Sequence, residues 1–245
     1  LVTGGIGTGK TSVLAAVRSA LRDAGRLVLS RPPHPDDAVD AAYVVDDAQL
    51  LGDDELGEFA EHITDPAATV VVATAPLVHR PALRALVTAL QRESPAVSLG
   101  PLPVAEVNRI LTSSLGAPAS AETVRSVLTA TAGLPFLVTA VARSTIPPDQ
   151  SAHFTLIDRL CRIDVRTRDT LLITSLSQGL GPDDVAAALH CSGEEAVDLV
   201  DRARATGLVE PSFDRRFVRL VHECLAQLAG AARHYEIETS LLNSQ

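Results

Sequence analysis

The chain has 245 residues, of which 46% are hydrophobic and 21% charged, and its formal net charge is −9. This composition is typical of a folded chain of one large or two ordinary domains, and it excludes a disordered one. The acidic balance argues against a nucleic-acid-binding surface, and no apolar run reaches the roughly 18 residues of a membrane helix.

The first predicted element is the end of an apolar strand, Leu1 to Thr3, followed by a glycine-rich loop. The loop fits the phosphate-binding pattern G-x-x-x-x-G-K-[ST] with the residues Gly4-Gly5-Ile6-Gly7-Thr8-Gly9-Lys10-Thr11. Lys10 is the only lysine, although Lys and Arg together number 21. A P-loop needs a compact ammonium between the β- and γ-phosphates, where a planar guanidinium does not fit. The pattern therefore favours a nucleotide site over a glycine-rich turn with a chance lysine.

A helix with one buried face is predicted after the loop, because apolar residues recur at Val13, Leu14, Val17 and Leu21. Strand, glycine loop and helix together form the context that supports a P-loop. We expect the loop N–H groups and the start of the helix, through Ser12, to cradle the phosphates of ATP or ADP. Lys10 would also assist catalysis, and Thr11 would place its hydroxyl on Mg²⁺.

Apolar strands and helices alternate in the chain up to residue 99. Strands are predicted at 26–30, 41–47, 69–74 and 97–99, and helices at 53–62 and 81–92. A run of prolines, Pro32, Pro33 and Pro35, interrupts the chain after the second strand. This alternation predicts an α/β fold with a parallel sheet that helices cover on both faces.

The strand at 41–47 ends in two acids, in the sequence Val44-Val45-Asp46-Asp47, and matches a Walker B strand. We expect Asp46 to hold Mg²⁺, directly or through water, and Asp47 to act as a general base toward the attacking water. The alternative is an ordinary strand end at which Asp-Asp begins a turn. The P-loop upstream makes the functional interpretation the stronger one.

Other polar residues follow the next strand. Thr74, at its tip, is a candidate catalytic contact to the γ-phosphate or the water, and a threonine that merely caps the strand is nearly as good an explanation. Arg80 and Arg84 are candidates for charge-neutralising fingers. We prefer the alternative that these arginines solvate a helix face.

The second half of the chain is predicted to be helical from 103 to 143, with a break at Gly133-Leu134-Pro135 and a linker at 145–149. Further helices are expected at 168–176, 182–189 and 194–205. The segments 208–210 and 217–220 resemble the two strands of a small hairpin, and three helices plus a hairpin predict a winged helix. We therefore expect a P-loop α/β domain at 1–102, a small helical lid at 103–148 and an all-α or winged-helix domain at 149–245.

The three cysteines, Cys161, Cys191 and Cys224, are far apart and lack metal-ligand spacing. We expect buried free thiols in a reducing cytoplasm. Because methionine is absent, we also expect the sequence to be a segment of a longer protein.

The order of these motifs resembles the STAND class of ATPases, the signal-transduction ATPases with numerous domains. The Walker A loop, the Val-Val-Asp-Asp strand, Leu99-Gly100-Pro101-Leu102, Gly133-Leu134-Pro135-Phe136 and the expected winged helix carry this resemblance. The chain is most similar to the NTPase core of bacterial LuxR-type large ATP-binding regulators. The resemblance implies that Pro135 packs near the adenine or ribose.

The resemblance also bears on Val221-His222-Glu223, which is similar to the Met-His-Asp motif of the class. It implies that His222 reaches the β-phosphate of ADP and holds a closed state. The alternative is a histidine at the start of the last helix whose polar atoms are satisfied by local backbone.

The chain departs from the class in three ways. The segment between Lys10 and Asp46 is short, with Pro32-Pro33-His34-Pro35 in place of a helix. Ala73-Thr74-Ala75-Pro76 lacks the arginine that the class often has after the fourth strand. The Walker B pair is Asp-Asp instead of Asp-Glu, and the shorter Asp47 predicts slow hydrolysis.

These observations predict a switch that binds ATP or ADP with Mg²⁺, self-associates in the ATP state and belongs to a transcription regulator. The acidic helix at 194–205 argues against direct DNA contact by this segment, so a flanking domain would bind DNA. One alternative is an AAA-type ATPase with a DNA-binding winged helix, of the origin-recognition or helicase-loader type. Another is a scaffold that does not hydrolyse nucleotide.

Overall fold

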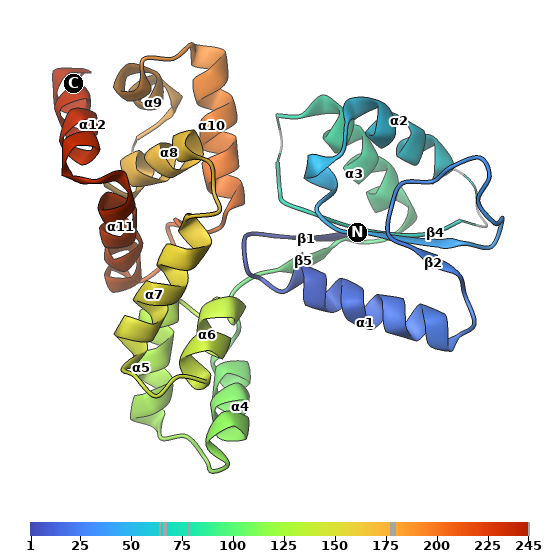
Figure 1. The fold of residues 1–245 in the computed structure, drawn as a ribbon, viewed down its shortest axis with the longest axis horizontal. Helices are drawn as coiled ribbons and strands as arrows, with labels where there is room; N and C mark the ends of the chain where they lie inside the picture. The colour runs from blue at the N-terminus through green and yellow to red at the C-terminus, as the bar shows by residue number, and fades with distance from the viewer. Residues whose placement is uncertain (64, 66–67, 78, 177–179, 245) are drawn as a thin grey trace. The chain divides into compact units, whose positions relative to one another are not determined.

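The computed structural model describes all residues except 64, 66–67, 78, 177–179 and 245. The chain divides into two compact units, Leu1–Gly100 and Pro101–Gln245 (Figure 1).

The first unit is built on a parallel sheet with the strand order β2-β3-β4-β1-β5. Val2 lies opposite Ala73 on one side and Val97 on the other, which places β1 between β4 and β5. The predicted parallel α/β fold is confirmed. The strands are β1 (Val2–Gly4), β2 (Val28–Leu29), β3 (Ala42–Val45), β4 (Thr69–Thr74) and β5 (Val97–Leu99).

Helices cover both faces of this sheet, with α1 (Lys10–Asp23) on one face and α2 (Asp53–His62) and α3 (Pro81–Glu93) on the other (Figure 1). Successive strand residues point to opposite faces, so an apolar run supplies both layers. From β3, Tyr43 and Val45 join the layer under α2 and α3, whereas Val44 joins the layer under α1.

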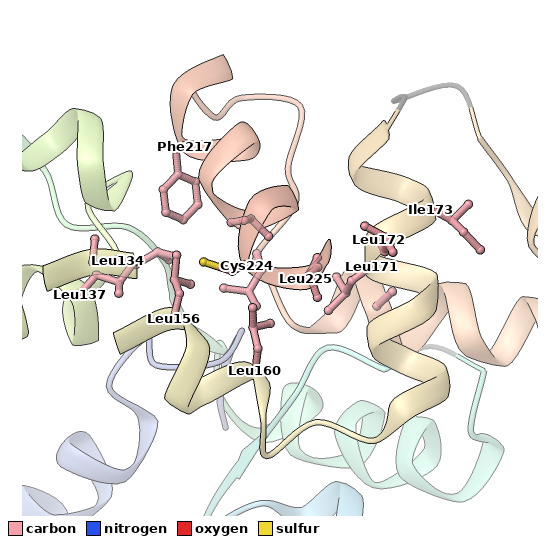
Figure 2. Packing of buried hydrophobic residues seen from close by; sticks show 14 of the residues in the cluster. Leu134, Leu137, Leu156, Leu160, Leu171, Leu172, Ile173, Phe217, Cys224 and Leu225 are labelled. Carbon is pink, nitrogen blue, oxygen red and sulfur yellow. The ribbon is translucent and has the colours of Figure 1, made fainter. Parts of the chain in front are cut away.

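In its described residues, the second unit consists of helices and the loops that connect them. One cluster of buried apolar side chains runs through it, and Figure 2 shows leucines of α6, α7 and α8 gathered around Phe217, Cys224 and Leu225 of α11. Its helices are α4 (Val104–Leu115), α5 (Ala121–Thr131), α6 (Pro135–Ala142), α7 (Pro148–Leu160), α8 (Val165–Leu176), α9 (Pro182–Leu189), α10 (Gly193–Ala205), α11 (Arg215–Ala229) and α12 (Ala231–Ser244).

The break predicted at Gly133-Leu134-Pro135 is confirmed. Ala132 and Gly133 are left-handed, with φ of 48° and 73°, and Pro135 is the first residue of α6. A Cβ on Gly133 would lie 2.8 Å from the Leu102 carbonyl oxygen, and the Leu102 N–H donates to the Gly133 carbonyl at 2.7 Å. The Gly-Pro-Leu and Gly-Leu-Pro segments therefore meet backbone to backbone.

The hairpin expected at 208–220 is wrong, because residues 217–220 lie inside α11. The Asp214 side chain caps this helix by accepting from the Arg216 N–H at 2.8 Å. Phe217, Val221, Cys224 and Leu225 are all buried, and their spacing is that of one helix face. The described residues therefore form no wing. One helix was expected near the end of the chain, whereas the structure has two, α11 and α12.

The expected burial of the cysteines holds for only one of them. Cys224 is fully buried, and burial raises the pKa of its thiol to about 12. Cys191 is half-buried, and Cys161 is exposed just beyond the end of α7. In the described part of the chain, no helix is long and apolar enough to cross a membrane.

Candidate functional site at the carboxyl end of the sheet

The loop between β1 and α1 is shaped by its glycines. A Cβ on Gly4 would lie 2.6 Å from the Thr8 hydroxyl oxygen and 2.7 Å from the Leu99 carbonyl oxygen, so no larger residue fits there. Gly7 and Gly9 have φ of 71° and 100°, a region that glycine adopts without strain. Gly4 thus packs closely against Thr8 and Leu99 of β5, and the loop that follows leads to Lys10 at the start of α1.

Lys10 closes over this loop. Its ammonium donates to the carbonyls of Gly4 at 2.8 Å and Gly5 at 2.9 Å, and the Thr8 hydroxyl donates to Gly5 at 3.0 Å. The only lysine of the chain therefore lies at the start of α1 with its ammonium on the loop carbonyls, at the position for which the sequence predicts phosphate binding. These two acceptors are neutral carbonyls, and a bond from the ammonium to an anionic phosphate would be a stronger, charge-assisted one.

The start of α1 offers further donors. Its N-cap is Gly9, and in the described structure no side chain caps it and no acidic residue lies in its first turn. The first N–H groups of a helix have no intrahelical partner, and the helix dipole gives this end a partial positive charge. This end of α1 therefore suits an anion.

Thr11 and Asp46 meet at this site. The Thr11 hydroxyl donates to the Asp46 carboxylate at 2.7 Å, although the two residues are 35 positions apart. The other carboxylate oxygen of Asp46 accepts from the Asp47 N–H at 3.0 Å, which fixes its direction. A hydroxyl and a carboxylate in contact are oxygen ligands of the kind that Mg²⁺ prefers, with waters and phosphates completing the shell. The residues present thus fit a magnesium–nucleotide site.

Asp47 adopts the left-handed conformation, with φ of 49°, and begins the 3₁₀ helix η1 (Ala48–Leu50). Its exposed carboxylate accepts from the Gln49 amide at 2.9 Å. A turn therefore begins at Asp47, as the alternative interpretation expected, and its carboxylate is exposed. A turn alone does not account for the bond between Asp46 and Thr11.

Thr74 is the last residue of β4, which lies between β1 and β3, and it is 1% exposed. Its hydroxyl lies 3.1 Å from the Gln49 amide oxygen and also 3.1 Å from the Ala75 carbonyl. Gln49 was not among the predicted site residues. The only sequence signal for it is a polar residue inside the apolar run Ala48-Gln49-Leu50-Leu51.

The guanidinium of Arg80 is bonded to backbone carbonyls and a carboxylate. It donates to the Gln49 carbonyl at 2.7 Å, to the Leu51 carbonyl, and to the Asp53 carboxylate at 2.6 Å. It ties η1 to the start of α2, so it neither solvates a helix face nor stands free as a finger. Arg84 lies exposed on α3.

Pro135 and His222 belong to the second unit. His222 lies in the middle of α11, and its Nδ1 is 3.0 Å from the Ser175 hydroxyl of α8. The expectation of a histidine at a helix start with backbone partners is therefore wrong. Burial and His234, whose ring centroid is 5.5 Å away, lower the pKa of His222 against an opposing effect of Glu238 and Glu223. A lowered pKa favours the neutral form of this imidazole.

No family model matches the chain, and no curated protein matches it in sequence. Among solved structures the chain is similar to the DNA clamp loader delta protein of Bacillus subtilis, with 14% sequence identity and a TM-score of 0.34. The match covers 99% of this chain and 94% of that one. A likeness this distant does not define an activity, so function is inferred from the site residues.

Proposed function

We propose that the chain binds ATP with Mg²⁺ at the β1–α1 loop and acts as a nucleotide-dependent switch. The observation that carries this proposal is the 2.7 Å bond between Thr11 and Asp46, at the start of α1 and just after β3. It joins the two sequence motifs predicted to share a magnesium ion. Lys10, Gly9 and the uncapped start of α1 add donors for the phosphates.

Each residue has a distinct part in this proposal. Lys10 exchanges its loop carbonyls for phosphate oxygens, and Thr11 and Asp46 hold the Mg²⁺, which neutralises phosphate charge when it is bound. Asp47 orients or deprotonates a water as general base. Asp47 is exposed and one methylene shorter than glutamate, which supports slow hydrolysis and a role as a switch.

The finer assignment is to the regulatory core of a bacterial LuxR-type regulator, with self-association in the ATP state. It rests on the order of the Walker A, Walker B, Gly-Pro-Leu and Gly-Leu-Pro motifs, without the winged helix, which the described residues do not form. Charge in the second unit supports a role without direct DNA contact: Arg202 pairs with Asp198 at 2.7 Å, and Arg166 pairs with Glu195 of the same acidic helix at 2.8 Å. The ADP latch by His222 and the packing of Pro135 near the adenine remain parts of this proposal.

A second candidate is an AAA-type ATPase that binds DNA, which the parallel α/β core supports as well as it supports a switch. A gel shift of the whole chain with duplex DNA at low salt distinguishes the two, because non-specific binding is strongest there. A shift that disappears with added salt favours the second candidate, and no shift favours the switch.

The magnesium part of the proposal is tested by ATP affinity with Mg²⁺ and with EDTA. We expect Mg²⁺ to tighten ATP binding to the wild type by about tenfold or more, and Thr11→Val and Asp46→Asn to lose this gain. Ser19→Ala, an exposed position on the same helix, is the matched control and should keep it. An undiminished Mg²⁺ effect in both site variants would contradict the assignment.

A further inference from the structure

Gln49 connects the ends of two neighbouring strands. Its side-chain N–H donates to the Asp47 carboxylate at 2.9 Å, and its carbonyl oxygen accepts from the Ala75 N–H at 3.0 Å. The orientation of the amide is settled by these partners, because a backbone N–H can only donate and a carboxylate can only accept. Gln49 therefore joins Asp47, two residues after the end of β3, to Ala75, the residue after β4.

Gln49 is itself held in place from two sides. Arg80 donates to its backbone carbonyl at 2.7 Å, and the Thr74 hydroxyl lies 3.1 Å from its amide oxygen. η1 packs against β4, and Ala48 beside Gln49 is fully buried. A side chain with both ends bonded and its backbone anchored has lost its rotamer freedom in advance, as precise placement of a reacting group requires.

Thr74 is buried, and among the site residues its hydroxyl bonds the Gln49 amide oxygen. Its exposed fraction is 1%, while Gln49 is half-buried and Asp47 exposed. The polar group of β4 therefore acts on the exposed carboxylate through the glutamine that lies between them. The Gln49 amide bonds one oxygen of the Asp47 carboxylate, Oδ1, and Asp47 is exposed.

We propose that Gln49 is a positioning residue that links Thr74 to Asp47 and sets the direction of the Asp47 carboxylate for its water. This inference rests on the proposed function for the role of Asp47. The link itself, from β4 through Gln49 to Asp47, is a property of the protein without nucleotide.

The functional test compares Gln49→Met with Gln91→Met, which makes the same change at an exposed position of α3. We expect Gln49→Met to slow single-turnover ATP hydrolysis about tenfold or more while the Kd for ATP stays within about twofold. Gln49→Glu keeps the acceptor for the Ala75 N–H but loses the donor to Asp47, so the same slowing is expected. A wild-type rate in either variant, or a parallel loss of ATP affinity, would overturn the proposal.

A second measurement needs no nucleotide. Asp47→Ala and Thr74→Val are combined in a double-mutant cycle read by Tm, first in the wild type and then with Gln49→Met. We expect the two shifts to be non-additive by about 2 °C in the wild type and additive without Gln49. Additive shifts in both backgrounds would disprove the link. If the protein bound no ATP but the cycle showed coupling, the proposed function would fail and the link would stand.

Discussion

At the scale of residues, the P-loop was predictable because its chemistry is local. Gly4 to Thr11 form one continuous segment, and the single lysine marks the position where a compact cation is required. The bond from Thr11 to Asp46 was predictable only through a motif rule that links two distant segments. Gln49 and the Ser175 partner of His222 were not predictable, since each depends on packing that no spacing in the sequence encodes.

Gly4 gives a stability prediction at this scale. Gly4→Ala brings a methyl group to 2.6 Å from the Thr8 hydroxyl and 2.7 Å from the Leu99 carbonyl. Because the Leu99 carbonyl belongs to the backbone, the backbone has to shift to make room for the methyl group. We expect a loss of about 1–3 kcal/mol in the free energy of unfolding, measured with urea.

The control for this change is Gly57→Ala in the interior of α2, where a Cβ meets nothing within 4 Å. Alanine is the better helix former, so this variant should gain about 0.5–1 kcal/mol. If Gly4→Ala unfolded at the same urea concentration as the wild type, the close packing of Gly4 against Thr8 and Leu99 would be refuted.

At the scale of elements, strands and helices with uniform patterns were predicted well. β3 and β4 are continuous apolar runs, because helices cover both faces of the sheet. The start of α11 was misassigned because Phe217-Val218-Arg219-Leu220 is a short, mostly apolar run beside the polar Asp214-Arg215-Arg216, whereas its helical period becomes visible only with Val221, Cys224 and Leu225. The four residues 217–220 alone favoured a strand, whereas the amphipathic face of the whole segment, Arg215–Ala229, determines that it is a helix.

The proline-rich segment before β3 is ordered by Asp37. Its carboxylate accepts two bonds from Arg31, one from the His34 N–H at 2.8 Å and one from the Tyr43 hydroxyl at 3.2 Å. The Arg31 bonds are the largest cause that lowers the pKa of Asp37 from 3.8 to about 2; desolvation, the next largest, opposes them, and the bonds from His34 and Tyr43 lower it further.

A folded-state pKa below the unfolded value means that Asp37 stabilises the protein above pH 4, and that this stabilisation is lost as the pH falls from about 4 to about 2. We expect Asp37→Asn to lower Tm at pH 6, with the difference from the wild type shrinking over that range. Asp36→Asn is the control, because the Asp36 side chain is 92% exposed. A Tm difference that stayed constant from pH 6 to pH 2 would show that the Asp37 charge does not support the loop.

At the scale of the whole molecule, the chain combines a parallel α/β unit with a helical unit. The fold class followed from the alternation of apolar strands and helices, and the helical character of the second half followed from its period. The α/β unit holds Gly4 to Thr11, Asp46, Asp47 and Thr74 at the carboxyl end of one sheet, whereas Pro135 and His222 belong to the helical unit. A switch works only through different affinities for its two states, so nucleotide binding at the α/β unit is the claim on which the account depends.

The most direct test of this claim is a calorimetric titration of the whole chain with ATP and Mg²⁺, repeated with Lys10→Ala and Lys10→Arg. We predict one saturable site in the wild type and an affinity about tenfold to a hundredfold weaker in Lys10→Ala, because a charge-assisted bond to phosphate is lost. Lys10→Arg keeps the charge but not the compact shape, so it should bind more weakly than the wild type. An unchanged affinity in Lys10→Ala, or no saturable binding by the wild type, would contradict the account.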